Sequence, residues 1–368
     1  MKIIFLILSP FFSFLALHQT EEPAQEANRA RKQSHERLNE LFEVRAFVQL
    51  VKEFEKSVQP NGALSNDGKA IATVAQAAIE TGQLDFAKEL LETARPKSAG
   101  ERVAIEKARL LFARDELEQA AKALTLESEK GTRLRFSKEP RAWLLFARTK
   151  ARLQNYGSAA QAAENYLRLS PYGVGSATAW QIRADAALRK NEPKKAHALI
   201  AKAKEHRQWH ELFVARTLQC RQDPKAELPK LGLALLWMEA NVPERAREGL
   251  VPLLESSPEF CRGWFHLGEA ERALAEFQAA EQAYSKALEC DPKHAPSRSN
   301  RAALRAETGN LEGSSQDYEI LLSGPNAKDP RYLEAHLGFA RVLKALGMNG
   351  PAKMRYSTYR SWGGKGNL

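Results

Sequence analysis

Apolar residues recur along most of the chain at the three- and four-residue spacing of an amphipathic helix. Short breaks rich in Gly, Pro and Asn separate these helical stretches. The clearest breaks are Thr81-Gly82, Asn155-Tyr156-Gly157, Asn191-Glu192-Pro193, Asn241-Val242-Pro243 and Gly309-Asn310. No stretch shows the sustained β-branched alternation of a strand. The pattern therefore predicts an all-α protein made of helices joined by short turns.

The helical stretches also repeat at a nearly fixed interval. Pro258 and Pro292 are 34 positions apart, and the turn at Gly324-Pro325 follows 33 positions later. Between the two prolines stand, in order, Trp264, Leu267, Gly268, Ala280, Tyr284 and Ala287. This stretch resembles the tetratricopeptide repeat (TPR), W-x2-L-G-x2-Y, then A-x3-F, then P, with Glu271 in place of the first Tyr. The resemblance implies antiparallel helix-turn-helix units that stack into a right-handed superhelical solenoid with a concave inner face.

Looser matches place seven further units on the same frame, so that about eight units cover residues 68 to 362. Each of these seven units has one small residue where its two helices are expected to approach most closely. In chain order these residues are Ala75, Ala108, Ala147, Ala184, Ala234, Ala302 and Gly338. Large aromatic residues recur at the repeat interval, where they would fill the groove to the neighbouring unit. We therefore expect core positions, rather than a ligand-stacking set, at Trp143, Trp180, Trp237 and Trp264.

The ends of the chain depart from the repeat. Residues 1–19 hold one lysine and the uncharged stretch Ile3 to Leu17, which is typical of a signal peptide or a short anchor. Residues 20–62 form a charged segment and a capping helix, expected as one long helix over residues 28 to 57. We expect two TPR-like lobes at 63–222 and 223–368, with an unpaired helix from about residue 204 to 222. If residues 1–19 are cleaved, we expect an exported, periplasmic or secreted chain with no membrane span. If they are retained, we expect them to anchor the protein to the membrane facing outward.

The composition excludes several protein classes. The chain has 368 residues, of which 43% are hydrophobic and 27% charged, enough apolar residues to build a core. Three cysteines without a CxxC pair exclude a disulfide scaffold, a zinc ribbon and a c-type haem protein. Cys261 and Cys290 stand at neighbouring ends of one expected helix pair. The sequence is compatible with a disulfide between these two cysteines and with two buried free thiols.

Positive charge is concentrated in the middle of the chain. The formal net charge is +10, and residues 137–222 hold sixteen Lys and Arg against six Asp and Glu. The TPR resemblance implies that six arginines at recurring repeat offsets face the concave groove: Arg102, Arg109, Arg141, Arg148, Arg152 and Arg189. Stacked guanidinium groups would bind carboxylates or phosphates. The alternative is that these arginines only decorate the surface and confer solubility. On the groove interpretation, helix packing would not need the side chains of Arg109 and Arg148.

The sequence offers little catalytic chemistry. It has no nucleophile elbow, P-loop, dinucleotide fingerprint or H-E-x-x-H motif. Gly173-Val174-Gly175 reads as a loop, since no expected strand precedes it. His206 and His210 lie one helical turn apart and could chelate a metal, but no third ligand is assured. We expect them on an ordinary polar helix face, and we expect neither a cofactor nor an enzyme.

These observations predict a non-catalytic scaffold of the cell envelope that binds an acidic protein or peptide in a partly basic concave groove. The alternative is a binder of an anionic polymer, such as a cell-wall polysaccharide, lipid headgroups or nucleic acid, and nucleic acid is not favoured. An enzyme on a helical solenoid is the least favoured class. A carboxylate clamp of Lys and Asn is not evident, because its Asn positions hold Gln76, Arg109 and Arg148. A hydrophobic alternative surface would use Leu228, Leu231 and Leu235.

Overall fold

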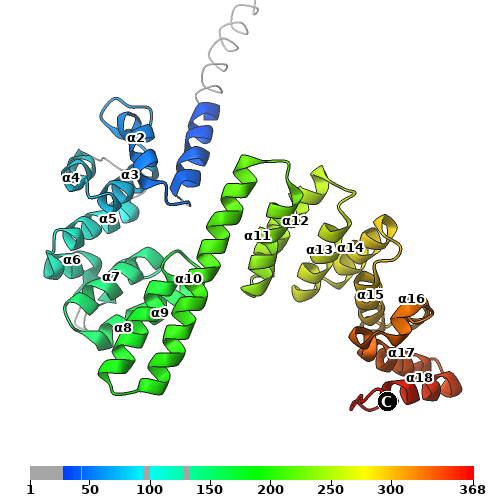
Figure 1. The fold of residues 1–368 in the computed structure, drawn as a ribbon. Coiled ribbons are helices and arrows are strands. Elements are labelled where there is room, and N and C mark those ends of the chain that lie inside the picture. The colour runs from blue at the N-terminus through cyan, green and yellow to red at the C-terminus, as the bar shows by residue number, and fades with distance from the viewer. Residues whose placement is uncertain (1–27, 43, 94–99, 128–132) are drawn as a thin grey trace, which may run out of the picture. The chain divides into compact units, whose positions relative to one another are not determined.

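The computed structural model describes residues 28–42, 44–93, 100–127 and 133–368, and the expected signal peptide lies outside these ranges. The chain divides into two compact units, Met1–Val214 and Ala215–Leu368, called unit 1 and unit 2 below. The division falls inside the longest helix, α10, whereas the expected lobe boundary lies at the end of that helix (Figure 1).

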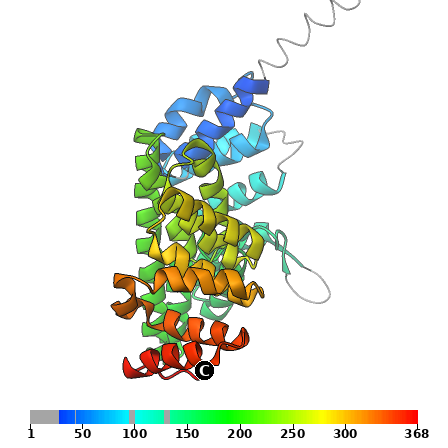
Figure 2. The same ribbon diagram turned by 90° about the vertical axis from the view of Figure 1, so that its right-hand side faces the viewer.

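Unit 1 consists of short helices and one minimal hairpin. Its elements are a helix of residues 28–42, α2 (Phe47–Val58), α3 (Gly68–Glu80), α4 (Leu84–Thr93), α5 (Gly100–Ala113), α6 (Leu117–Leu124), β1 (Thr125–Leu126), β2 (Arg133–Leu134), α7 (Pro140–Arg152), α8 (Tyr156–Leu169), α9 (Ser176–Arg189) and most of α10 (Pro193–Gln222). Strands β1 and β2 pair antiparallel, and they project from the side of the unit in Figure 2. These two strands are the one departure from the all-α expectation within the described ranges.

Unit 2 begins within α10 and continues with helix pairs. Its further elements are α11 (Glu227–Glu239), α12 (Pro243–Ser256), α13 (Cys261–Ala273), α14 (Phe277–Cys290), α15 (Ala295–Glu307), α16 (Leu311–Leu321), the short 3-10 turns η1 (Pro325–Lys328) and η2 (Pro330–Tyr332), α17 (Leu333–Ala345) and α18 (Asn349–Ser361). From α3 to α18 the helices follow one another as eight helix-turn-helix pairs. This confirms a TPR-like helical repeat over the expected range of about 68 to 362.

Each of the eight pairs turns through one residue with a left-handed backbone. These residues have φ between 56° and 87° and are Gly82, Asp115, Gln154, Asn191, Asn241, Ala275, Gly309 and Gly347. A β-carbon is disfavoured in this conformation, so Gly and Asn recur there. The breaks seen in the sequence therefore mark the tight turns inside the pairs.

We predict that Ala275→Gly stabilises unit 2. Ala275 has a φ of 61°, where a residue with a β-carbon costs about 1 kcal/mol more than glycine. The free energy of unfolding in urea should therefore rise by roughly 0.5–1 kcal/mol. The gain is limited because glycine has more conformational entropy in the unfolded chain and loses it on folding. Gly309→Ala, the same change in reverse one repeat later, should lower it by a similar amount. An unchanged or lower stability for Ala275→Gly would contradict this account.

Small residues let the two helices of a pair approach closely. Ala147, Ala184 and Ala302 are completely buried. At the equivalent position of the pair α13–α14, a β-carbon on Gly268 would lie 2.5–2.6 Å from ring atoms of the buried Tyr284. Neighbouring pairs then stack on one another, as α12 does on α13 and α14 on α15. The core is thus a continuous series of apolar layers within each unit.

The expected capping helix is two helices instead of one. The helix of residues 28–42 ends before a turn in which Arg45 has a φ of 57°, and α2 begins at Phe47. Folding back lets Leu38 and Leu50 enter one apolar cluster with Ile71 of α3. Val48, expected in the apolar stripe, is 70% exposed because the turn rotates it away from that cluster. The two helices still cover the first helix pair, as a cap should.

The expected separate helix from residue 204 to 222 is also wrong. Helix α10 runs for 30 residues without interruption. The sequence from Lys194 to Gln222 contains neither Gly nor Pro, so nothing in it ends the helix early. In the described part of the chain, no helix combines the length and the apolar composition that a membrane crossing requires.

Candidate functional site

Unit 1 contains a pocket whose wall is rich in arginine. It has a volume of about 590 Å³ and lies between α3, α5 and α7, with the turn before α2 and the Gly173–Gly175 loop at its rim. We call it the arginine pocket, after the five arginines that line it: Arg45, Arg102, Arg109, Arg141 and Arg148. Other lining groups are the carboxylates of Glu80 and Glu139, the amide of Gln76 and the hydroxyl of Tyr166.

The repeat geometry explains why four of these arginines meet. Arg102 and Arg109 lie on α5, and Arg141 and Arg148 lie 39 positions later on α7. Both helices are the first helix of consecutive pairs, and they contact each other. Equal positions on stacked pairs point in similar directions, so the two helices project their arginines into the same space. The sequence predicted this grouping, although it missed Arg45 in the turn before α2.

Arg109 is held by acidic neighbours. Its Nε donates to Glu106 Oε2 at 2.6 Å, and its Nη1 lies 3.6 Å from Glu80 Oε1. The side chains of Arg109 and Glu106 are only 8% and 1% exposed. Burial raises the pKa of the Glu106 carboxyl, against the opposing effect of Arg109. The expectation that Arg109 is not needed for packing is therefore wrong, because its loss would leave Glu106 buried without a partner.

Three arginines of the pocket lack such a carboxylate. Within the described residues, no Asp or Glu oxygen lies within 4.0 Å of a guanidinium nitrogen of Arg102, Arg141 or Arg148. Arg141 lies over the ring of Phe42 at 5.2 Å and donates a long hydrogen bond of 3.4 Å to Gln76. Burial lowers the pKa of Arg141, and it lowers the pKa of Arg148, with repulsion from Arg109 acting in the same direction on both. Glu106 and Glu139 attract Arg141, and Glu80 attracts Arg148, so the carboxylates of the pocket offset its positive charge only in part.

The other two candidate arginines lie outside the pocket. Arg152 is in the last turn of α7, where it pairs with Asp115 at 2.7 Å. Arg189 ends α9 and lies over the ring of Tyr156 at 5.0 Å. Both are exposed, because the repeat brings the last turn of a first helix to the edge of the unit. Four of the six expected arginines therefore line the pocket, Arg152 lies outside it over the same Phe112 ring as Arg148, and Arg189 is a separate surface residue.

The two histidines of α10 face into unit 1 instead of forming a polar surface. His206 is only 5% exposed, its Nδ1 lies 3.1 Å from Ser176 Oγ, and its ring stacks on Tyr172 at 4.6 Å. His210 is half-buried beside Trp209. The expected polar helix face is wrong, since α10 packs this side against the loop before α9. No group of three His, Cys, Asp or Glu side chains that could hold a metal occurs in the described residues.

The expected tryptophan positions are half-buried and have a further role. Trp143 donates its Nε1 to the carbonyl of Ser137 at 2.8 Å, and Trp264 does so to Pro258 at 2.7 Å. Both acceptors stand six positions earlier, in the turn that connects two pairs. In α15 the same position holds Arg298, which donates to the carbonyl of Pro292 at 2.6 Å. This repeat position therefore fixes the preceding turn as well as filling space between helices.

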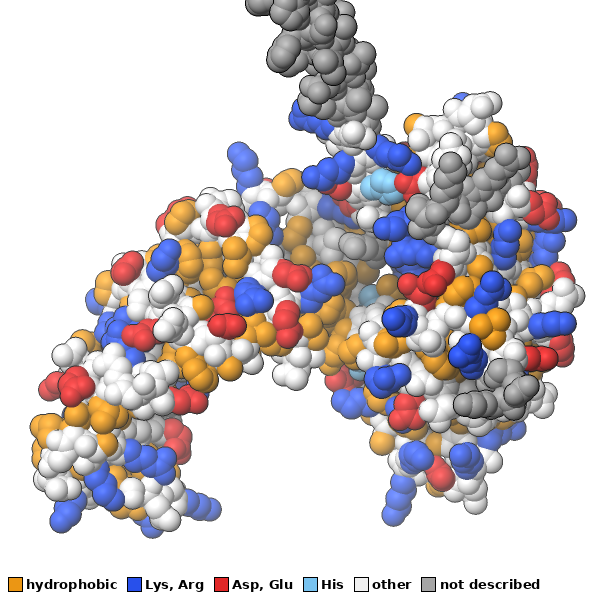
Figure 3. All heavy atoms as spheres, turned by 180° about the vertical axis from the view of Figure 1, so that it is seen from behind, with side chains coloured by type: hydrophobic (Ala, Val, Ile, Leu, Met, Phe, Trp, Pro, Cys, Tyr) orange, Lys and Arg blue, Asp and Glu red, His pale blue; other side chains and the backbone are white. Residues whose placement is uncertain are grey.

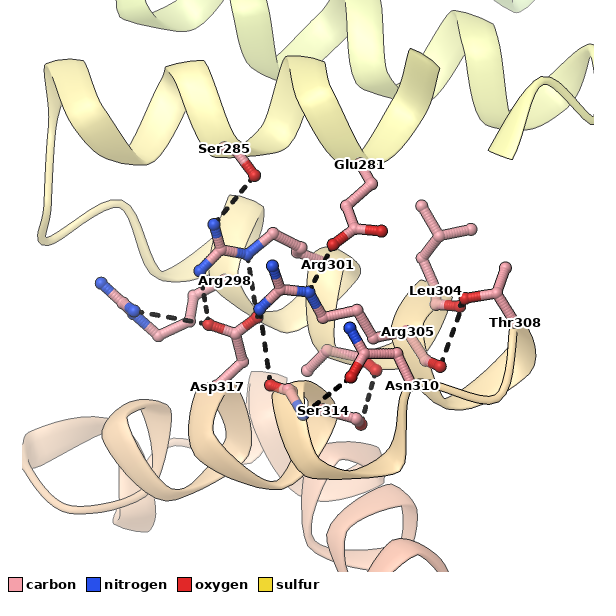
Figure 4. Close-up of polar contacts among 12 residues, drawn as sticks. Glu281, Ser285, Arg298, Arg301, Leu304, Arg305, Thr308, Asn310, Ser314 and Asp317 are labelled. Carbon is pink, nitrogen blue, oxygen red and sulfur yellow. Dashed lines mark hydrogen bonds and ion pairs between the residues drawn. The ribbon is translucent and has the colours of Figure 1, made fainter. Parts of the chain in front are cut away.

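Unit 2 contains a buried polar network that was not predicted from the sequence (Figure 4). Asp317 of α16 is 2% exposed and accepts from Arg301 at 2.6 and 2.8 Å and from Arg305 at 2.9 Å. Arg298 lies 3.6 Å from the same carboxylate. Arg301 also donates to Ser285 at 2.9 Å, and Arg305 to Glu281 at 2.7 Å, both on α14. Because their donors are already occupied, these arginines join three helices and do not form a ligand site.

Cys261 and Cys290 form a disulfide, which decides between the two options that the sequence left open. Their Cα atoms are 5.5 Å apart, and the bond joins the start of α13 to the end of α14. Cys220 is a free, half-buried thiol.

Unit 1 has a second pocket of about 800 Å³, whose described lining includes Trp143 and Phe146 but only two basic side chains, Arg133 and Lys150. Figure 3 shows acidic and basic side chains interspersed over the visible face of each unit, without a continuous basic track. The hydrophobic alternative is not a surface, because Leu231 is 2% exposed and Leu235 packs against the same core cluster. Only Leu228, at 60% exposure, is free to contact a partner.

No protein-family model matches this chain, and no curated protein matches its sequence. Many solved structures are similar to parts of it, among them three of MamA. One titled "Crystal structure of MamA" has 17% identity and a TM-score of 0.37, covering 49% of this chain and 93% of that chain. A "Crystal structure of MamA protein" has 14% identity and a TM-score of 0.35, covering 62% and 92%. A "MamA RS-1 ArsTM double mutant" has 12% identity and a TM-score of 0.37, covering 52% and 96%. At these scores the likeness carries no inference about function.

Proposed function

We propose that this protein is a non-catalytic interaction scaffold that holds an acidic group of a protein partner in the arginine pocket. The observation that carries the proposal is the pocket itself, where Arg102, Arg141 and Arg148 line a cavity and form no ion pair with any described residue. Desolvated positive charge without a counter-ion costs free energy. A partner that supplies the anion recovers this cost through charge-assisted hydrogen bonds.

The groups in the pocket favour binding over catalysis. A guanidinium remains protonated at all physiological pH values, so it neither donates nor removes a proton in a reaction. Of the carboxylates that could act as acid or base, Glu80 and Glu106 pair with Arg109, and Glu139 stands at the N-cap of α7 without an ion pair to a described residue. The Tyr166 hydroxyl accepts from the Gly175 amide at 2.9 Å, and burial raises the pKa of Tyr166. Orientation of an anion is thus the chemistry that these side chains support.

A protein partner is favoured over an anionic polymer because three half-buried arginines without an ion pair to a described residue lie together in one pocket. A polymer binder requires basic groups along a continuous path, each neutralising one charge of the polymer. Here the three half-buried arginines lie together in a cavity of about 590 Å³, a size typical of small-molecule sites. Such a cavity fits one acidic group that a folded or extended partner presents.

We place this scaffold in the cell envelope or outside the cell. The uncharged stretch from Ile3 to Leu17 supports export. The disulfide between Cys261 and Cys290 supports an oxidising compartment, because disulfides are rare in the reducing cytosol.

Removing two charges from the pocket tests the function. We predict that Arg141→Gln with Arg148→Gln weakens binding of an envelope protein captured by the wild-type chain by about tenfold or more. The matched control is Arg152→Gln with Arg189→Gln, which removes the same number of charges outside the pocket. The control should change the affinity less than about twofold, as expected for exposed charges. Titrations of the purified partner at low and moderate salt would measure both effects.

Two outcomes would contradict the proposal. If both double variants weaken binding equally and flatten its salt dependence, the protein binds anionic polymers, or other anionic partners, through many scattered basic side chains. If neither changes the affinity, the arginine pocket is not the partner site.

A further inference from the structure

The charges around the arginine pocket do not balance. Five arginines line it, against the carboxylates of Glu80 and Glu139 in its wall and of Glu106 beneath Arg109. The excess is two positive charges. Building on the proposed function, we infer that the pocket takes a compact dianion on a protein partner, either one phosphoryl group or two neighbouring carboxylates.

The arrangement of the arginines fits an anion with more than two oxygens. Arg141 and Arg148 lie seven positions apart on α7, two turns along one face of the helix. Arg102 and Arg109 approach them from α5, closely enough that Arg102 repels Arg141 and Arg109 repels Arg148. Each guanidinium offers a fork of parallel N–H donors. A single carboxylate fills one fork, whereas a phosphoryl group or a carboxylate pair can accept from both helices at once.

The apolar part of the wall indicates how the dianion is carried. Phe42, Phe47, Leu144 and Val174 line the cavity together with the arginines. They provide an apolar surface for an aromatic or aliphatic group next to the charge. A partly apolar wall strengthens the attraction between the arginines and an anion relative to bulk water. The best ligand is therefore a dianion attached to an apolar group rather than a free, hydrated ion.

The inference can be tested with small probes on the full-length protein. Calorimetric titrations would compare phenyl phosphate with benzoate, and malonate with acetate, at about pH 7.5, where a phosphate monoester carries nearly two charges. Each dianion should bind about tenfold or more tightly than its monoanionic counterpart. Arg141→Gln with Arg148→Gln should abolish this preference, and Arg152→Gln with Arg189→Gln should keep it. A larger affinity ratio of phenyl phosphate to benzoate than of malonate to acetate identifies a phosphoryl source, and the reverse identifies a carboxylate pair.

Acidification provides a second readout. The second pKa of a phosphate monoester is about 6, so phenyl phosphate should lose affinity as the pH falls towards about 5. Benzenesulfonate, which stays a monoanion, reports any change in the protein itself. The titratable groups facing the pocket are Glu80 of α3, Glu106 of α5, Glu139 before α7 and Tyr166 of α8. Protonation of these carboxylates would strengthen anion binding, so a loss specific to phenyl phosphate must come from the ligand.

The outcomes separate this inference from the proposed function. If benzoate and acetate bind as tightly as the dianions, the dianion inference is overturned, while the pocket remains a site for acidic groups. If no probe binds the wild-type chain, the dianion inference is also overturned, and the variants tested on the captured partner still decide the proposed function. A preference for dianions that survives Arg141→Gln with Arg148→Gln would move the site elsewhere and overturn it as well.

Discussion

Asp317→Ala should lower the free energy of unfolding by about 3–5 kcal/mol, the usual cost of removing one partner from a buried ion pair. Asp317 is 2% exposed, and Arg298, Arg301 and Arg305 converge on it with exposures of 13%, 15% and 19%. Without the carboxylate, three half-desolvated guanidinium groups would repel one another between α14, α15 and α16. The loss is large because water cannot readily replace the missing anion.

Urea unfolding of the full-length chain would measure this loss, with separate fits if the two units unfold independently. Glu281→Gln is the matched control, since Glu281 is 31% exposed and, among the described residues, forms one ion pair, with Arg305. It should cost about 1 kcal/mol or less. Adding Arg301→Leu should restore part of the stability of Asp317→Ala, because it removes one of the uncompensated charges. A loss below about 1 kcal/mol for Asp317→Ala would show that the network contributes little.

The repeat was predictable because two local signals agree. Small residues such as Ala147 and Gly268 occur where two helices must touch, and Gly or Asn occurs where the chain must adopt a left-handed turn. Both requirements act within one pair, so they leave a pattern of fixed period in the sequence. Where Gln154 is the left-handed residue, the adjoining Asn155-Tyr156-Gly157 marks the turn in the sequence.

The break between the helix of residues 28–42 and α2 left no comparable signal. Val44, Arg45 and Ala46 are compatible with a helix, so only packing against α3 explains why the chain folds back there. The same limit applies to the network around Asp317. Arginines at the repeat positions of Arg298 and Arg301 read as surface residues, and their burial depends on a carboxylate from another helix.

The arginine pocket was predictable in part. Equal repeat offsets correctly group Arg102 with Arg141 and Arg109 with Arg148. The repeat offsets do not reveal Glu106, although its i,i+3 spacing to Arg109 on α5 is visible in the sequence, and the burial of the pair depends on packing by other helices. The offsets also cannot separate Arg152 from the pocket arginines, since its outward direction follows from its place at the end of α7.

The disulfide is expected to be the second large contribution to stability. Replacing both Cys261 and Cys290 with serine should lower the free energy of unfolding by about 3–4 kcal/mol. This follows from the loop entropy that a crosslink with a sequence separation of 29 removes from the unfolded chain. The bond closes one helix pair in the middle of unit 2, so its loss should also loosen the stacking of α12 and α15 on that pair.

Reduction of the wild-type chain should reproduce the loss, whereas reductant should have no effect on the double serine variant. Cys220→Ser is the control, and it should unfold like wild type because this thiol takes no part in the bond. Alkylation of the denatured, unreduced chain would count the thiols, and one labelled cysteine is expected. Three labelled cysteines in protein recovered from an oxidising compartment would contradict the disulfide. Equal unfolding midpoints for wild type and the double variant would instead show that the bond forms without stabilising unit 2. In that case the close packing of Gly268 against Tyr284 would already be sufficient to hold α13 and α14 together.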